Sequence, residues 1–197
     1  IVNGDVFDRG PENFEALNWV LNQENTVYII GNHEFMAMFP DVAEDFLSDK
    51  YLSNASKEGL YWKHMSNDMR RELIERVANG EIKAASKPHE HIYSHAGLEN
   101  ISVKKANTQL KRTGEKLLEG LNSGPRKFEE AQNSIIEVVD NIHGTEIRST
   151  YPELFDLNRD ESGAVSSGGA VWRRFNHLDS SRKQVVGHTR GTYMQKH

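Results

Sequence analysis

The chain has 197 residues, which is enough for one domain with a hydrophobic core or for a domain with a helical insertion. Its formal net charge of -5 argues against broad binding of nucleic acid, and its lack of cysteine excludes disulfides, thiolate nucleophiles and cysteine-ligated zinc. The charge leads us to expect no specific nucleic-acid partner. No apolar run approaches the roughly 20 residues of a membrane-spanning helix, so we expect no membrane partner.

The first 34 residues predict a βαβ unit. Residues 1–3 form a short apolar run, residues 11–22 carry apolar side chains at helical spacing, and residues 27–30 (Val-Tyr-Ile-Ile) indicate a buried parallel strand. The chain starts inside a strand and without methionine, so we expect further residues before Ile1.

The remaining elements alternate between helices and strands. Ser66 or Asn67 is expected to cap a helix that Gly80 ends. The residues rich in Asp, Ser and Gly at 158–169 predict a loop. In chain order we expect helices at 40–47 and 66–77, strands at 82–85 and 91–94, a helical insertion or cap at roughly 102–143, and a strand at 184–186.

Polar groups follow four of the predicted strands. Asp5 comes after the first, Asn32 after the second, and His95 and His188 after two later ones. A single such residue is more often part of a turn, but ligands in α/β sheets bind outside the carboxyl ends of strands. Carboxylate, amide oxygen and imidazole together suit a hard or borderline divalent metal, so the set predicts a metal site.

Four motifs resemble those of the calcineurin-like metallophosphoesterases, in the order that this family has them. They are residues 4–10 (Gly-Asp-Val-Phe-Asp-Arg-Gly), 31–34 (Gly-Asn-His-Glu), 94–97 (Ser-His-Ala-Gly) and 187–189 (Gly-His-Thr). The likeness is greatest to the phosphoprotein phosphatase branch and its Shewanella-like bacterial and archaeal members. It implies an α/β fold in which two sheets pack face to face between flanking helices.

The resemblance also implies two divalent metals that bridge a hydroxide. Asp5 would bridge the metals, and Asn32, His95 and His188 would bind the second one. Ligands of oxygen and nitrogen without thiolate admit manganese, which we expect, or iron or zinc.

Substrate-handling roles are implied in the same way. His33 would be the general acid that protonates the leaving alkoxide, oriented by Asp8, and a nearby carboxylate would raise the pKa of such an imidazole. Arg9, whose planar guanidinium matches two phosphate oxygens, and Asn32 would hold the phosphate. Glu34 is expected to brace its loop through hydrogen bonds and not to bind metal.

A second phosphate-binding arginine often follows a tryptophan by two residues in the phosphatase branch. Trp172 is followed by Arg173 and Arg174, and the spacing favours Arg174, with Arg173 as the alternative. A third possibility is a solvated basic pair after a core tryptophan.

Two departures from the family pattern affect the prediction. No Asp-x-His triplet, which supplies the first metal, occurs in the chain, so it either lies upstream of Ile1 or the protein is a one-metal or inactive member. Phosphodiesterases of the superfamily usually end in Gly-His-x-His, whereas Arg190 stands at the last position here. With Asp8 and Arg9, this substitution favours phosphomonoesters.

The predicted function is therefore hydrolysis of phosphoserine, phosphothreonine or phosphotyrosine in proteins, by direct attack of the hydroxide that bridges the metals. A hydrolase of nucleotides such as diadenosine tetraphosphate is the alternative enzyme. A binding module that kept the fold and lost catalysis is the alternative outside enzymes.

Overall fold

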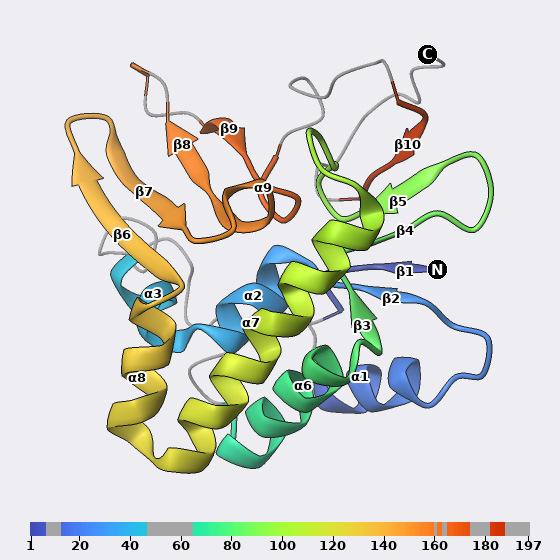
Figure 1. Cartoon of the computed structure of the whole chain (residues 1–197), viewed down its shortest axis with the longest axis horizontal. Helices are drawn as coiled ribbons and strands as arrows, with labels where there is room; N and C mark the ends of the chain where they lie inside the picture. Colours follow the sequence, from blue (N-terminus) through green and yellow to red (C-terminus); the bar gives the residue numbers. More distant parts are fainter. Residues whose placement is uncertain (7–12, 47–64, 160, 163–164, 174–181, 188–197) are drawn as a thin grey trace.

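The fold is taken from a computed structural model that describes residues 1–6, 13–46, 65–159, 161–162, 165–173 and 182–187. Hydrogen bonds between strands in these ranges define three small sheets (Figure 1). The predicted α/β class is confirmed. The face-to-face pairing of two sheets remains a prediction, because the described strands separate into three groups.

Three parallel strands form the first sheet, in the order β1-β2-β3. Val2 pairs with Tyr28, and Tyr28 with Ile82. Because parallel strands end at the same edge, the loops after β1 and β2 leave the sheet side by side. The strands are β1 (Val2–Asn3), β2 (Tyr28–Ile29) and β3 (Ile82–Lys83).

The second sheet has the order β10-β5-β4, with β10 parallel and β4 antiparallel to β5. The carboxyl ends of β5 and β10 therefore also coincide, and the amide of Gly187 donates a hydrogen bond to the carbonyl of His95 (2.9 Å). The strands are β4 (Ala85–Ser86), β5 (Ile92–Ser94) and β10 (Gln184–Val185).

The third sheet is antiparallel in chain order and corrects two predictions. Residues 136–141 form a strand instead of a helix, since the β-branched residues at 135, 136, 138 and 139 favour an extended chain. Part of the loop predicted at 158–169 belongs instead to two paired strands, the first of which begins at the buried Leu157. The strands are β6 (Ile136–Asn141), β7 (Gly144–Ser149), β8 (Leu157–Arg159) and β9 (Val165–Gly168).

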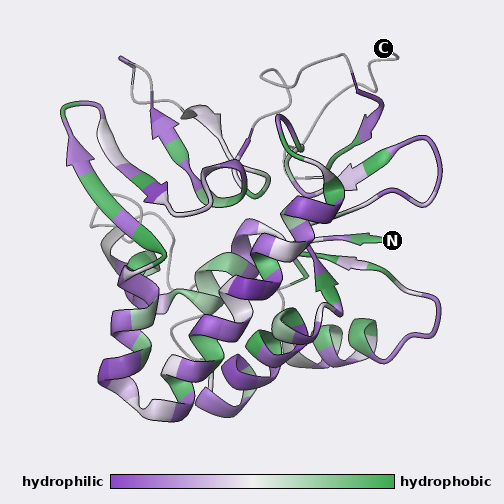
Figure 2. Ribbon diagram, viewed as in Figure 1, coloured by the Kyte–Doolittle hydropathy of each residue, from purple (hydrophilic) through white to green (hydrophobic). Residues whose placement is uncertain are grey.

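The helices predicted at 11–22, 40–47 and 66–77 form close to these bounds, whereas α2 and α9 were not predicted. Figure 2 shows hydrophilic and hydrophobic residues alternating along α6, α7 and α8. Ser66 caps α6 by accepting from the amide of Met69 (3.3 Å), and Gly80 ends it in the left-handed conformation (φ 78°), as expected. The helices in the described ranges are α1 (Asn13–Leu21), α2 (Asn32–Met38), α3 (Pro40–Phe46), α6 (Asn67–Asn79), α7 (Val103–Ser123), α8 (Pro125–Asn133) and α9 (Pro152–Phe155).

One hydrophobic core joins these elements, and it includes buried residues of α7 and α8, such as Leu110 and Phe128. The two helices lie in the stretch predicted as an insertion, and that designation stays a prediction.

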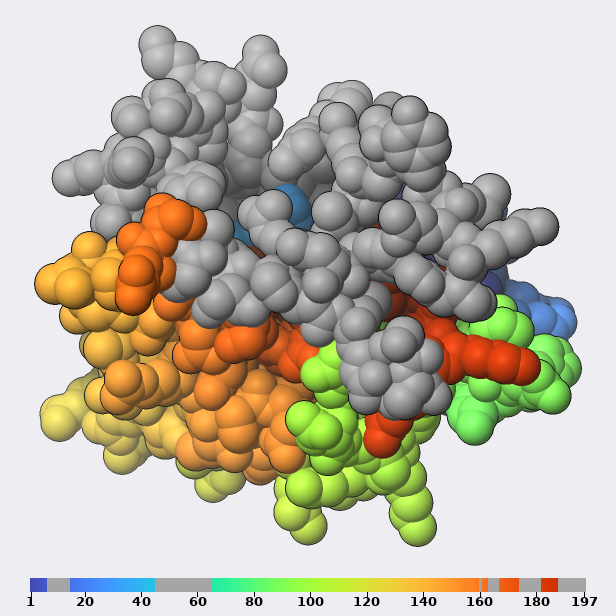
Figure 3. All heavy atoms as spheres, turned by 90° about the horizontal axis from the view of Figure 1, so that it is seen from above, coloured from blue at the N-terminus to red at the C-terminus, as the bar shows by residue number. Residues whose placement is uncertain are grey.

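Figure 3 shows β7 to β9 and the 182–187 segment on one face of the molecule. Among the described residues, no helix combines the length and apolar character that crossing a membrane requires.

An aromatic cluster fixes α2 in this core. Phe35 packs against Phe39, Phe155 and Trp172, with ring centroids 4.8, 5.2 and 5.5 Å apart. Stacked and edge-on aromatic pairs add about 0.5–1.5 kcal/mol each beyond burial. The first turn of α2 carries residues 32–34, so the core holds this turn in place.

Candidate metal centre

The loops after β1 and β2 touch through two glycines. A Cβ on Gly4 would lie 2.6 Å from the Cα of Gly31, and a Cβ on Gly31 would lie 2.4 Å from Asp5 Oδ1. Gly4 has φ +78°, and Asp5 follows with φ +55°, a left-handed conformation that aspartate tolerates better than most residues. The glycines therefore let the Asp5 carboxylate approach the start of α2.

Three of the predicted metal ligands converge at this point. His95 Nε2 lies 3.1 Å from Asn32 Oδ1 and 3.3 Å from Asp5 Oδ2. The amide of His33 donates to Asp5 Oδ1 (3.2 Å), and His33 Nε2 lies 3.8 Å from Asp5 Oδ2. His95 and Asn32 are buried, whereas the side chains of Asp5 and His33 are 30% and 17% exposed. The predicted general acid is thus beside the predicted ligand Asp5, and both side chains are partly exposed.

The other nitrogen of His95 determines its tautomer. Nδ1 lies 2.8 Å from the carbonyl oxygen of Asn3, which can only accept, so Nδ1 carries the proton. Burial lowers the pKa of His95, while the Asn3 carbonyl and the charge of Glu34 raise it less, so the neutral imidazole is favoured. Its Nε2 then offers a lone pair toward Asn32 and Asp5.

Asp5 Oδ2, Asn32 Oδ1 and His95 Nε2 each present a lone pair at this point, and such a set suits a cation. If the Asn32 side-chain amide were flipped, its NH₂ group would face His95 Nε2 and that contact would become a hydrogen bond. The contact between Nε2 and Asp5 would remain one of two acceptors, because an ionised carboxylate has no proton to donate. A metal-binding histidine usually donates its other ring N–H to a carbonyl or carboxylate, as Nδ1 of His95 does to the carbonyl of Asn3. Counting His, Cys, Asp and Glu alone, the described part of the chain holds no group of three suited to a metal, so Asn32 and residues outside these ranges are needed.

The comparisons with known proteins agree with this chemistry. Residues 1–187 match the calcineurin-like phosphoesterase family. The chain belongs to this family. The match covers nearly the whole sequence and therefore makes a metal-dependent phosphoesterase the probable activity, without determining a substrate. Neither the search of curated proteins nor that of solved structures found a match.

Glu34 holds the two loops of the candidate site together. Its fully buried carboxylate accepts from the amides of Asp5 (2.9 Å), Val6 (2.9 Å) and Gly31 (2.8 Å) and from the hydroxyl of Tyr28 (2.7 Å). The predicted bracing role is confirmed. Tyr28 was not predicted, although a tyrosine in a buried apolar strand usually needs a hydrogen-bond partner.

Four predicted site residues, namely Asp8, Arg9, Arg174 and His188, lie outside the described residues. The segment before His188 does approach the site. The backbone amide of Gly187 donates to the carbonyl of His95, and a Cβ on Gly187 would lie 3.3 Å from the side-chain nitrogen Nδ2 of Asn3. These contacts agree with His188 as a metal ligand, and that assignment stays a prediction.

Arg173 already has partners in the fold. Its Nε and Nη2 both donate to the carbonyl of Gly168 (3.0 and 2.7 Å), and Nη1 forms an ion pair with Glu99. A guanidinium held in this way ties the loop after β5 to the end of β9. The alternative assignment of Arg173 to the phosphate is therefore disfavoured relative to Arg174.

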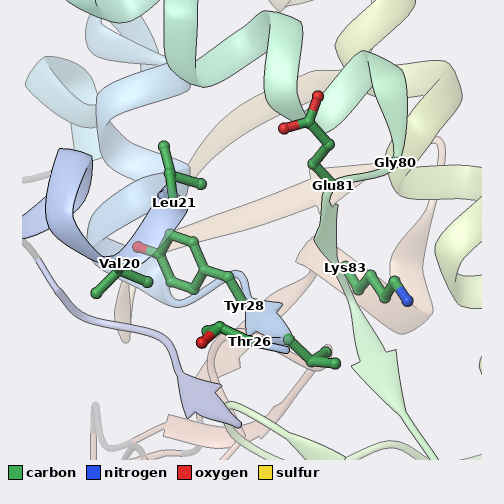
Figure 4. A pocket seen from close by; sticks show the side chains of 8 residues that line it. Val20, Leu21, Thr26, Tyr28, Gly80, Glu81 and Lys83 are labelled. Carbon is green, nitrogen blue, oxygen red and sulfur yellow. The ribbon is translucent and has the colours of Figure 1, made fainter. Parts of the chain in front are cut away.

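A pocket of about 300 Å³ lies away from this chemistry (Figure 4). It is lined by residues at the amino-terminal ends of β2 and β3, including Thr26, Tyr28 and Glu81, and by the end of α1. Asp5 and Asn32 follow the carboxyl ends of β1 and β2. The pocket and the candidate metal centre thus lie at opposite ends of the strands of the first sheet.

The lowered pKa of His95 predicts a pH dependence of stability. In the unfolded chain this histidine takes up a proton near pH 6.5, and in the fold it does so only at lower pH. The unfolded state therefore binds more protons as the pH falls below 6.5, and the metal-free protein loses stability. Urea unfolding between pH 7 and 5 should show a smaller loss in His95→Gln than in the wild type, and an equal loss would contradict a buried neutral His95.

Proposed function

We propose that the protein is a phosphomonoesterase of the phosphoprotein phosphatase branch, acting on phosphoserine, phosphothreonine or phosphotyrosine in proteins. The observation that carries the proposal is the convergence of Asp5, Asn32 and His95, with the partly exposed side chain of His33 beside Asp5. The sequence features that favour this branch are Asp8 and Arg9, together with Arg190 where phosphodiesterases have a histidine.

Two divalent metals, with manganese expected, would be held by Asp5, Asn32, His95 and His188. Asp5 has two charged oxygens on one side chain, which a bridging position requires, and Asn32 has one neutral oxygen suited to a terminal ligand. When bound, the metals neutralise charge on the phosphoryl group and make water a nucleophile near neutral pH.

The side chains of the protein would bind and protonate the substrate. Arg9, Arg174 and Asn32 would hold the phosphoryl oxygens, and His33 would point its proton at the ester oxygen. Water attacks phosphorus and gives up one proton to solvent, the bond from phosphorus to the ester oxygen breaks, and that oxygen takes the proton of His33 to leave as an alcohol. A proton from solvent then restores His33. Asp8 would orient the imidazole before transfer.

The test is a substrate panel with protein expressed from the full-length gene. Phosphopeptides, a simple phosphodiester and diadenosine tetraphosphate should be compared at equal manganese concentration, with metal content measured in parallel. Release of phosphate from phosphopeptides alone is expected. Preference for the dinucleotide would establish the nucleotide hydrolase instead, and absence of both metal and turnover would favour the inactive binding module.

The two adjacent arginines should separate into a substrate-binding and a structural residue. Arg174→Ala should weaken inhibition by inorganic phosphate about 10- to 100-fold, the effect of losing a hydrogen bond to a charged group. Arg173→Ala, its matched control, should instead lower thermal stability by removing the bonds to Gly168 and Glu99. The reverse pattern would move the phosphate role to Arg173.

A further inference from the structure

The Glu34 carboxylate receives two donors on each oxygen. Oε2 accepts from the amides of Asp5 and Gly31, and Oε1 accepts from the amide of Val6 and from the hydroxyl of Tyr28. A buried carboxylate is expensive to desolvate unless its lone pairs are satisfied. Within the described ranges Glu34 has no ion pair, so these four donors carry the cost of burying its charge.

Tyr28 supplies the only side-chain donor among these four. It lies in the middle strand of the first sheet, 2% exposed, with its ring packed in the hydrophobic core. The other three donors are backbone amides of the two site loops, which a substitution by any residue except proline leaves in place. Tyr28 is thus the point at which the bracing network is fixed to the rigid sheet.

Asp5 is held from two sides by the first turn of α2. Glu34 accepts from its amide, and the amide of His33 donates to its Oδ1, which leaves Oδ2 directed toward His95. Its left-handed backbone (φ +55°) is uncommon for a residue other than glycine and needs such support. A change in the position of Glu34 is therefore passed to the backbone of Asp5, and through the backbone to its carboxylate.

We propose that Tyr28 and Glu34 form a positioning pair that sets the Asp5 carboxylate for metal binding, an inference that rests on the proposed metal-dependent function. Tyr28 orients the Oε1 side of Glu34, so that Oε2 holds Asp5 and Gly31 together. Both residues would act on the metal site through Asp5.

Tyr28→Phe tests the pair because it removes one hydroxyl and keeps the ring. In the metal-free protein, the amides of Asp5 and Gly31 should exchange with deuterium about 10-fold faster, as expected for a loosened local bond. Titration calorimetry should show a manganese dissociation constant 10- to 100-fold higher, the usual effect of losing an outer-shell partner. Tyr151→Phe, a partly exposed tyrosine on the segment before α9, is the control and should change neither.

A double-mutant cycle distinguishes positioning from general destabilisation. Glu34→Gln places an amide group against two donors and should weaken manganese binding more than Tyr28→Phe does. Adding Tyr28→Phe to Glu34→Gln should then cause little further loss, because both act through the same carboxylate. Additive losses, or wild-type exchange and affinity in Tyr28→Phe, would overturn the pair. Absence of manganese binding in the wild type would instead refute the proposed function, while the metal-free exchange measurement would still decide the pair.

Discussion

Replacing His33 by asparagine is expected to lower kcat on a phosphoserine peptide by about 100-fold or more, with the metal content unchanged. Asparagine cannot deliver a proton to the leaving oxygen at neutral pH. The side chain of His33 lies 3.8 Å from Asp5 Oδ2, but the hydrogen bond that supports Asp5 comes from the backbone amide of residue 33, which the substitution keeps. The effect should therefore be confined to catalysis.

The leaving group provides the decisive comparison for His33. An aryl phosphate such as p-nitrophenyl phosphate releases a stable anion that needs no proton, so His33→Asn should reduce its turnover much less than that of the peptide. His91→Asn is the matched control, since His91 is exposed and lies four residues before His95. Equal losses on both substrates, or full activity on the peptide, would rule out His33 as the general acid.

The position of the candidate site could be predicted because it depends on local sequence. Short apolar runs that end in Gly-Asp or Gly-Asn-His fix where a strand stops, and parallel pairing then brings the loops to one edge. The same local signals correctly predicted the Ser66 cap and the Gly80 end of α6.

The parts that could not be predicted depend on contacts between distant segments. The third sheet needs the pairing of β6 to β9, and its polar strands, such as the one containing Asn158, resemble a loop until their partners are known. The bond from His95 to the Asn3 carbonyl joins residues 92 positions apart. No periodicity reveals such a contact. The partners of Arg173 became apparent in the same way, only from the folded chain.

Asp5→Asn should deplete the protein of metal without unfolding it. The substitution removes the only carboxylate among the three described ligands, and a direct ligand should be worth at least the roughly 100-fold in affinity that an outer-shell partner can contribute. The structure also predicts the metal-free state of the variant. With its oxygen on the amide of His33, the new Asn side chain would turn its NH₂ group toward the lone pair of His95 Nε2, 3.3 Å from the present Asp5 Oδ2.

Two opposing effects on Asp5→Asn therefore follow from one geometry. In the absence of metal, an unfavourable meeting of acceptors becomes a hydrogen bond, worth about 0.5–1.5 kcal/mol, so the variant should melt at the same temperature as the wild type or above it. In the presence of manganese, the wild type alone should gain stability, because a ligand that binds only the folded state stabilises it by mass action. Elemental analysis and paired melting curves measure both effects, with Asp140→Asn in the β6–β7 hairpin as the control. Full metal occupancy in Asp5→Asn would contradict the bridging assignment, whereas a lower melting temperature without metal would show that the carboxylate stabilises the fold and that the three acceptors do not repel one another.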